Sequence, residues 1–222
     1  METKNEPPSN LPMEDGKETV FSFFKAPVTN TKPHKTVGLL QIYNAIKGNY
    51  YKERTEKLRK ILPPLPFGEG PGEGLGEGPV GEAARKFKAS TFDYCTFSGT
   101  FTTRSDKALL KHSGLLCMDF DHISNVDSLR NQLLQDEYFD TQLLFVSPSG
   151  NGLKWIIRMN TPSGDLGGLS FSHSNYFTAV SNYIRHTYGI DVDKSGRDIS
   201  RACFLPHDPT AYINPTLIIH NS

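Results

Sequence analysis

The sequence contains little cysteine. Cys95, Cys117 and Cys203 are its three cysteines, and they are far apart with no CxxC pair among them. An odd number of isolated cysteines supports neither a zinc knuckle nor a disulfide framework. Free, reduced thiols are typical of cytosolic proteins. The polar first residues, METKNEPPSNLPMEDGKE, also lack the apolar stretch of a signal peptide. We therefore expect the protein to work in the cytoplasm.

Long hydrophobic runs and an excess of one charge are also absent. No apolar run approaches the roughly 18 residues of a membrane span, so we expect no membrane partner. Lysine and arginine together number 24, as do aspartate and glutamate, so the formal net charge is zero. The chain has no global basic field to attract nucleic acid. This disfavours a protein that wraps DNA, and it leaves room for an enzyme that grips a few phosphates.

Apolar residues are scarce, at 36% of the sequence, which predicts segments outside the core. Residues 1–18 have the composition of a disordered leader. Residues 65–85 are almost wholly Gly, Pro and Glu, and we interpret them as a flexible loop in an insertion at 63–85. A phosphate-binding loop is the alternative, but its terminal Lys-Ser/Thr pair is missing and the glutamates would repel phosphate. We expect 19–222 to form one domain.

Strand-like and helix-like patterns alternate along this domain. Strands are expected at 20–24 (as an edge strand), 86–104 with a bend at Ser98-Gly99, 115–123, 142–152, 153–159, 202–208 and 217–220. Helices are expected at 37–48, 49–62, 125–136 and 176–189, the last closed by Gly189. The order lacks the even rhythm of a doubly wound fold. The pattern therefore predicts an α+β fold with a mostly antiparallel sheet.

Two carboxylates close the strand LLCMDFDHI. Asp119 and Asp121 are two positions apart, so on a strand their side chains share a face. Adjacent carboxylates repel each other unless a cation lies between them. Hard oxygen ligands suit Mg²⁺ or Mn²⁺. A solvated strand end with two acids is the alternative for so short a motif.

A tract of small residues, SPSGNGLK, follows the next expected strand. It contains Ser147, Ser149, Gly150 and Gly152. Small residues let backbone N–H groups and hydroxyls approach a triphosphate closely. Lys154 could then place its ammonium group against phosphate charge. The alternative is an ordinary hairpin turn, because S-G and N-G pairs are common in turns.

The third candidate segment, residues 189–209, is dense in charge. It holds Asp191, Asp193, Asp198 and Asp208 together with Lys194, Arg197, Arg201 and His207. Arg201 precedes an expected strand and is a candidate clamp on phosphate, because a guanidinium binds oxyanions with two donors. One aspartate could complete a metal site. A charged surface turn with internal Asp–Arg pairs is the alternative.

In this order, the three segments resemble the motifs of the archaeo-eukaryotic primase superfamily. That superfamily carries DhD, then SxH or SGxxH, then hD. Asp119 and Asp121 match the first motif, SPSGNGLK the second and Asp193 the third. More closely, residues 20–215 resemble the VirE-type N-terminal domain of mobile-element proteins from Bacteroides-like bacteria, through SGTFTTR, LLCMDFDHI, FVSPSGNGLKWII and DISRACFLPHDPTAYINP.

The resemblance implies a fold, a reaction and its partners. The fold would be primase-like, with an RRM-like, mostly antiparallel sheet packed by helices. The function would be primer synthesis or extension by a nucleotidyltransferase on a single-stranded DNA or RNA template, with a separate or fused helicase. Asp119, Asp121 and Asp193 would be catalytic and hold Mg²⁺ or Mn²⁺. The nucleoside triphosphate would be bound by Ser147, Ser149, Gly150, Gly152, Lys154 and Arg201.

One departure from the motifs leaves a second reading open. Lys154 stands where the second motif has histidine. A lysine beside metal-bound phosphate stays charged, so we expect a phosphate anchor and not a base. The second reading is a catalytically weak or inactive module that binds nucleotide or nucleic acid. A third, a DxD-dependent glycosyl- or phosphotransferase, is disfavoured by the motifs that follow.

Overall fold

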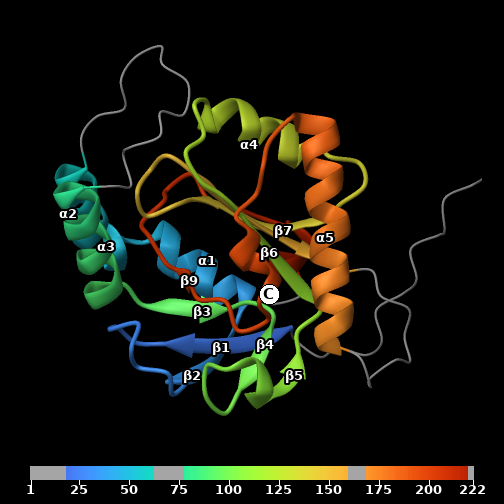
Figure 1. The fold of residues 1–222 in the computed structure, drawn as a ribbon, viewed down its shortest axis with the longest axis horizontal. Helices are drawn as coiled ribbons and strands as arrows, with labels where there is room; N and C mark the ends of the chain where they lie inside the picture. Colours follow the sequence, from blue (N-terminus) through green and yellow to red (C-terminus); the bar gives the residue numbers. More distant parts are fainter. Residues whose placement is uncertain (1–18, 63–77, 160–168, 220–222) are drawn as a thin grey trace, which may run out of the picture.

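The structure, a computed structural model, describes residues 19–62, 78–159 and 169–219 (Figure 1). The predicted leader at 1–18 and most of the predicted insertion, 63–77, lie outside these residues. The described residues form antiparallel sheets packed by helices, which confirms the α+β class. None of the helices among them is long and apolar enough to cross a membrane.

The first sheet has four strands in the order β2-β1-β3-β9, and every neighbouring pair is antiparallel. These strands are β1 (Val20–Phe24), β2 (Lys35–Gly38), β3 (Tyr94–Thr96) and β9 (Cys203–Phe204). β1 lies inside the sheet, so its prediction as an edge strand was wrong. Phe21 and Phe24 lie on opposite faces of β1, and both are fully buried. β1 is therefore covered on both faces, which explains why nearly all of its residues are apolar.

The second sheet has the order β10-β7-β8-β6 and is also antiparallel. Its strands are β6 (Leu115–Phe120), β7 (Thr141–Val146), β8 (Leu153–Arg158) and β10 (Tyr212–Ile213). Side chains alternate between its two faces. Leu115 and Cys117 of β6 pack in the core shared with the first sheet, and Leu116 and Met118 pack in the core on the other face.

Three helices cover the second sheet. The helix α1 (Leu39–Lys47) contributes its apolar side to the core shared by the sheets. On the other face lie α4 (Val126–Leu134) and α5 (Leu169–Tyr188) (Figure 1). α5 is followed by Gly189, with a φ of 67°, which confirms the expected glycine stop.

Two predicted segments take another form. Residues 79–91 form the helix α3 (Pro79–Thr91), so the expected loop to 85 and the expected strand from 86 were wrong there. Pro79 is suited to open the helix, and Ala84 and Phe87 pack with Leu58 of α2 (Lys52–Ile61). α2 follows a short 3₁₀ turn, η1 (Asn49–Tyr51).

The C-terminal apolar segment is helical and not a strand. Residues predicted as the strand 217–220 belong, as far as they are described, to α6 (Thr216–Ile219). Asn214 explains the difference, because its side-chain oxygen accepts hydrogen bonds from the N–H and the hydroxyl of Thr216 at 3.1 and 2.8 Å. Such a cap, followed by proline, starts a helix.

The predicted bend at Ser98-Gly99 separates β3 from a small hairpin. Its strands are β4 (Gly99–Phe101) and β5 (Leu109–His112), joined through the 3₁₀ turn η2 (Asp106–Ala108). A Cβ on Gly99 would lie 2.3 Å from the carbonyl oxygen of Lys111, so the close pairing requires glycine. The three cysteines are free, as expected, and the sulfurs of Cys117 and Cys203 lie 3.9 Å apart.

Two histidines meet where β5 contacts α5. The Nε2 of His112 lies 3.2 Å from the Nδ1 of His173, and the Nδ1 of His112 accepts a hydrogen bond from the N–H of Gly114 at 2.9 Å. His112 must therefore carry its proton on Nε2 and donate it to His173. Burial, followed by the neighbouring His173, lowers the pKa of His112 to about 4, and burial also lowers that of His173.

This pair predicts a loss of stability in mild acid. In the unfolded chain the imidazoles take up protons near pH 6.5, whereas folded His112 resists protonation until about pH 4. The free energy of unfolding should therefore fall as the pH decreases from about 6.5 toward 4. Urea denaturation at a series of pH values measures it. His112→Gln should flatten this slope, and the same change at the exposed His186 should leave it unchanged; equal slopes in all three proteins would contradict the assignment.

Candidate active site

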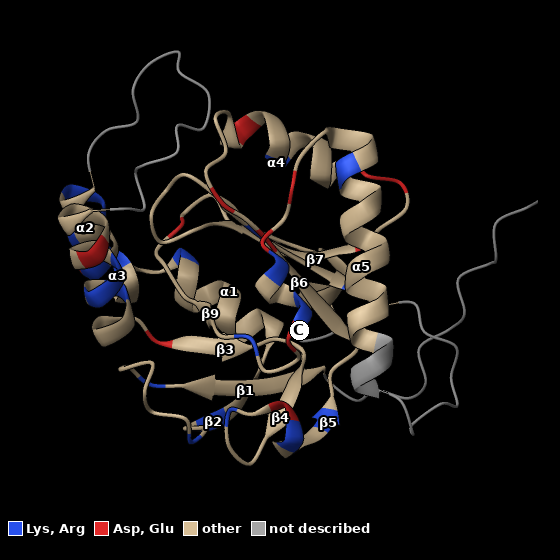
Figure 2. Cartoon of the chain, in the orientation of Figure 1, with Lys and Arg blue, Asp and Glu red and all other residues tan. Residues whose placement is uncertain are grey.

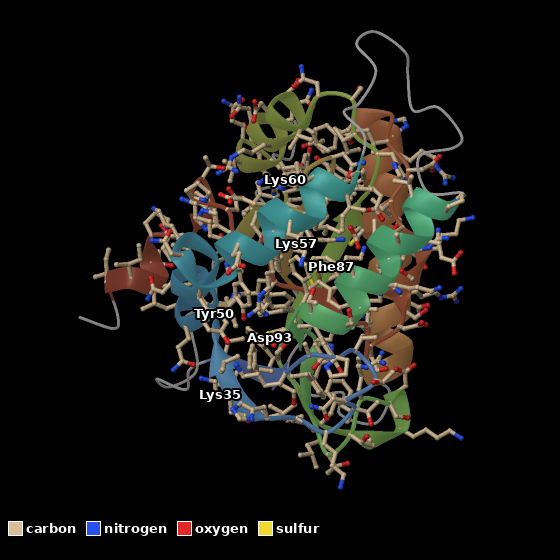
Figure 3. The ribbon with its side chains drawn as sticks, turned by 90° about the vertical axis from the view of Figure 1, so that its left-hand side faces the viewer. Lys35, Tyr50, Lys57, Lys60, Phe87 and Asp93 are labelled. Atoms are coloured by element: carbon tan, nitrogen blue, oxygen red, sulfur yellow. The ribbon has the colours of Figure 1, made fainter. Side chains whose placement is uncertain are left out.

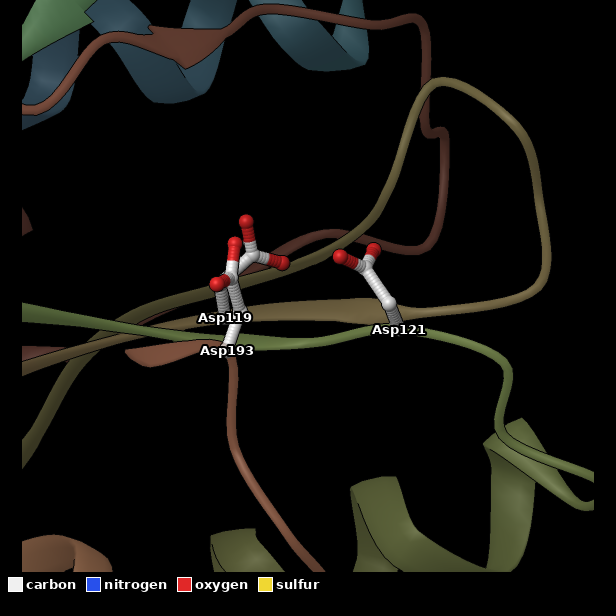
Figure 4. A group of neighbouring side chains, drawn as sticks. All are labelled: Asp119, Asp121 and Asp193. Atoms are coloured by element: carbon white, nitrogen blue, oxygen red, sulfur yellow. The ribbon is translucent and has the colours of Figure 1, made fainter. Parts of the chain in front are cut away.

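The last residues of β6 place two carboxylates on one side of the second sheet. Asp119 lies within β6, and Asp121 follows its end. Asp119 continues the face of Leu115 and Cys117, which is directed toward the first sheet. Figure 4 shows the carboxyl groups of Asp119 and Asp121 projecting to the same side of the chain. The strand alternation therefore gives the arrangement that the sequence predicts.

The third carboxylate is held beside them by the backbone. The N–H of Asp193 donates to the carbonyl oxygen of Asp119 at 3.0 Å. Asp193 also caps the 3₁₀ turn η3 (Lys194–Arg197), since its side chain accepts from the N–H of Ser195 at 2.9 Å. A Cβ on Gly196 would lie 3.2 Å from the carbonyl oxygen of Cys117. η3 therefore rests directly on β6 and fixes Asp193.

Asp119, Asp121 and Asp193 converge in space although the third is remote in the sequence (Figure 4). Each offers a carboxylate oxygen, and these oxygens all lie within 4.8 Å of one another. Three hard oxygen ligands at this separation fit a small divalent cation such as Mg²⁺ or Mn²⁺. The structure thus brings together the three predicted ligands, and their role stays a prediction.

Two cations compensate this negative cluster. Lys154 of β8 pairs with Asp119 in the strand register, and its ammonium group forms an ion pair with the Asp119 carboxylate. The side chains of Lys154 and Asp119 are only 9% and 15% exposed, so the pair is shielded from water. Arg201 binds Asp193 more openly, with 2.9 Å between nitrogen and oxygen. Lys154 thus contacts a carboxylate of the cluster directly.

The surrounding residues raise the pKa values of Asp119 and Lys154 and lower that of Asp193. Burial raises the pKa of Asp119, and the neighbouring Asp121 adds to this, although Lys154 opposes it. Burial alone would lower the pKa of Lys154, but Asp119 and Asp121 outweigh it and raise the pKa. For Asp193, burial is outweighed by hydrogen bonds from Ser195 and by Arg201, which lower the pKa. The two aspartates therefore favour the charged form of Lys154, and its role as a phosphate anchor stays a prediction.

The small-residue tract forms a tight hairpin turn between β7 and β8. Gly150 has a φ of 89°, a conformation that favours glycine. A Cβ on Gly152 would lie 2.1 Å from the carbonyl oxygen of Phe120. The backbone of the turn thus requires glycine at both positions, as the alternative of an ordinary hairpin turn predicts. Arg59 of α2 fastens the turn, donating to the carbonyl oxygens of Ser147 and Pro148 at 3.3 and 3.2 Å.

An open cavity of about 370 Å³ lies beside the cluster. Six of the predicted residues line it: Asp119, Asp121, Ser147, Ser149, Lys154 and Arg201. Gly150 and Gly152 belong to the turn behind the two serines. The wall also includes Asp198, one of the aspartates of the third candidate segment, and residues that the sequence did not single out, among them Lys88, Arg104, Ser200 and Phe204. Four cations and the carboxylates of Asp119, Asp121 and Asp198 therefore line one cavity.

Lys88 and Arg104 carry no sequence signal that could have marked them. Lys88 belongs to α3, and its ammonium group lies 5.6 Å from the centre of the Phe204 ring. Burial, and next the charge of Lys154, lower the pKa of Lys88. Arg104 closes SGTFTTR, and its guanidinium lies 5.5 Å from the ring centre of Tyr94. Only the packing of α3 against Phe204 and the hydrogen bonds of Arg104 to the carbonyl oxygens of Val28 and Thr31 bring these cations to the cavity.

Two other predicted acids lie apart from the cluster. Asp208 is only 4% exposed, and it accepts hydrogen bonds from the N–H groups of Val146 and Thr210. Asp191 lies on the surface and pairs with Arg185, and both side chains are more than half exposed. The alternative of internal Asp–Arg pairing thus describes Asp191, whereas Asp208 is a buried structural residue.

Comparison with known proteins identifies a family. A family model described as BT4734-like, N-terminal domain matches residues 86–213, which is more than half of the chain. The matched residues include the three converging aspartates, the turn between β7 and β8, and Arg201. No curated protein and no solved structure matches the chain.

Proposed function

The chain belongs to the family of BT4734-like N-terminal domains, and we propose that it is a metal-dependent nucleotidyltransferase of the primase-polymerase type. One observation carries the proposal: three carboxylates converge, and two of them, Asp119 and Asp121, line a cavity whose wall also holds the cations Lys88, Arg104, Lys154 and Arg201. The carboxylates suit a divalent cation, and the cations suit a triphosphate. The resemblance to primase motifs points to the same chemistry.

The donor set supports a metal of the expected kind. Asp119, Asp121 and Asp193 would hold Mg²⁺ or Mn²⁺ through carboxylate oxygens. A bound ion of this kind lowers the pKa of an attacking hydroxyl and balances charge on the phosphates. Arg201 and Ser195 hold the Asp193 carboxylate in place through hydrogen bonds. Asp193 is thus kept ionised and oriented before any ligand arrives.

The remaining residues of the cavity would bind and orient the nucleotide. A volume of about 370 Å³ lies in the range of small-molecule sites. Lys88 and Arg104 face the cavity without an ion pair to another described residue, so their charges are available to phosphate oxygens. The Ser149 hydroxyl donates to the Oδ1 of Asn151 at 2.6 Å, and the Ser147 hydroxyl, 3.0 Å away, donates to Ser149. Both hydroxyls would have to rotate to donate to a bound anion.

A second function is favoured by one contact. The ion pair of Lys154 with Asp119 puts a protein cation against a carboxylate that would bind the metal, and this competes with metal binding. If this competition prevents metal binding, the protein would be a module that binds nucleotide or nucleic acid with weak or no catalysis. Under either function, we place the protein in DNA replication of a mobile genetic element, with a single-stranded DNA or RNA template and a separate or fused helicase.

Incorporation of labelled nucleotides separates the two functions. With Mn²⁺, a single-stranded template and labelled nucleoside triphosphates, the wild-type protein should extend or make primers. Asp119→Asn should reduce incorporation by about 10³-fold or more, the loss of roughly 4 kcal/mol of transition-state stabilisation. Asp191→Asn, at the exposed Asp–Arg pair, is the matched control and should retain full activity. Nucleotide binding without incorporation in the wild type would instead favour the binding module.

A further inference from the structure

A second concave surface lies on the other side of α2 and α3. Tyr50, Arg54, Lys57 and Lys60 follow one another at spacings of three or four residues, so they share one side of η1 and α2. Figure 3 shows Lys57 and Lys60 on α2, Tyr50 on η1 before it, and Phe87 of α3 beside Lys57. We name these residues the basic-aromatic face. Tyr50 is 57% exposed, so its ring is accessible from solvent.

The basic-aromatic face borders a groove of about 490 Å³. Lys25, Tyr50, Arg54, Lys57 and Phe87 line it, together with the acidic residues Glu53 and Asp93. Asp93 is only 2% exposed and is paired with Lys25 and Arg54 at 3.7 Å each. The Asp93 charge is therefore balanced within the groove floor. The outer wall carries the exposed acid Glu53 as well as the cations, and Figure 2 shows both signs of charge on α2. Lys57 and Lys60 form no ion pair with any residue that the structure describes.

The cations lie against the rings. Lys25 and Arg54 are each 5.2 Å from the centre of the Tyr50 ring, and Lys57 is 5.5 Å from the centre of the Phe87 ring. Aromatic rings on which bases can stack, interleaved with cations that follow phosphates, are the pattern of single-strand binding. We infer that this groove binds single-stranded nucleic acid, with a base stacked on Tyr50 and phosphates on Arg54, Lys57 and Lys60.

The groove and the active site share two walls. Arg59 of α2 holds the turn at Ser147, while Lys57 of the same helix lines the groove. In α3, Phe87 lines the groove and its neighbour Lys88 lines the active-site cavity. A strand in the groove would thus run beside the active site. The inference that the groove carries the template rests on the proposed function. The inference that it binds single-stranded nucleic acid does not.

The dimensions and chemistry favour a short single strand over a duplex. The ten residue steps from Tyr50 to Lys60 span about 15 Å of helix. At about 3.4 Å per nucleotide in a stacked strand, this matches roughly four nucleotides. The ring of Tyr50 can stack only on a base that is not already stacked and paired on both sides. Duplex DNA would meet the cations alone.

Fluorescence anisotropy with a labelled 20-nucleotide oligo-dT tests the inference. The full chain is titrated in EDTA, so that binding does not depend on the metal site. Tyr50→Ala should weaken binding at least fivefold, the effect of losing about 1 kcal/mol of base stacking. Tyr50→Phe, which retains the ring, should bind within twofold of the wild type. Lys57→Ala should weaken binding and reduce the salt dependence by about one phosphate contact.

Matched controls separate this surface from a general effect of charge or exposure. Tyr138 is 74% exposed on another part of the molecule, and Tyr138→Ala should bind like the wild type. An equally labelled duplex should bind at least fivefold more weakly than the single strand. Wild-type affinity in Tyr50→Ala, or equal binding of duplex, would overturn the inference. Asp119→Asn should bind oligo-dT normally while losing metal-dependent activity, so the groove and the proposed function can fail separately.

Discussion

Lys154→Met is expected to lower the free energy of unfolding by about 3–5 kcal/mol in metal-free buffer, the cost of leaving one member of a buried ion pair without its partner. Lys154 and Asp119 face each other across paired strands and are almost wholly shielded from water. Methionine fills most of the same volume and removes the charge. The loss should therefore come from the uncompensated carboxylate and not from a cavity.

Divalent metal should reverse this loss. If Asp119 is a metal ligand, Mn²⁺ supplies the missing positive charge and stabilises the variant by mass action. Chemical denaturation in EDTA and in excess Mn²⁺ measures both effects. Lys111→Met, at an exposed lysine of β5, should change neither value by more than about 0.5 kcal/mol. A Lys154→Met protein that is destabilised and gains nothing from Mn²⁺ would show that the Lys154–Asp119 pair is structural only.

Asp208→Ala should be similarly costly for a different reason. The Asp208 carboxylate accepts from the N–H of Val146 at 2.8 Å and from the N–H and hydroxyl of Thr210 at 2.9 and 2.6 Å. It also lies 3.9 Å from the guanidinium of Arg130. Alanine would remove the acceptor of the half-buried Val146 N–H and of Thr210, and it would leave Arg130 with only its hydrogen bonds to Thr210. We expect a loss of about 3–5 kcal/mol in the free energy of unfolding.

Asp191→Ala is the matched control for this change. Asp191 also pairs with an arginine, but its side chain is 75% exposed and that of Arg185 63%. Exposed pairs contribute about 0–1 kcal/mol, so the urea midpoint should barely move. A loss at Asp208 no greater than that at Asp191 would contradict the structural role that we assign to Asp208.

Two members of the acidic cluster could be predicted from the sequence, because the alternation of side chains in a strand depends only on neighbouring residues. Asp119 and Asp121 had to share a face once LLCMDFDHI formed a strand. Asp193 could be added only through the order of the motifs, since the hydrogen bond from its N–H to Asp119 joins residues far apart in the chain. Arg201 and the two serines were candidates from their own chemistry, and the order of the motifs supported them.

Contacts between distant elements escaped prediction. Lys154 was expected to anchor phosphate, and the strand pairing that sets it against Asp119 could not be read from either strand alone. Lys88 lay in a segment whose Phe and Thr content indicated a strand, yet packing on Leu58 makes it a helix. The composition of β1 is compatible with an edge strand and with an inner strand. Its pairing with both β2 and β3 shows that it is an inner strand.

Binding of Mn²⁺ to the whole chain tests the central claim most directly, namely that Asp119, Asp121 and Asp193 form one metal site. Electron paramagnetic resonance counts free Mn²⁺ during a titration of the wild type, Asp119→Asn, Asp193→Asn and Asp191→Asn. We predict saturable binding by the wild type and Asp191→Asn, and a loss of at least tenfold in affinity in each of the other two variants. Equal Mn²⁺ affinity in all four proteins would contradict the account.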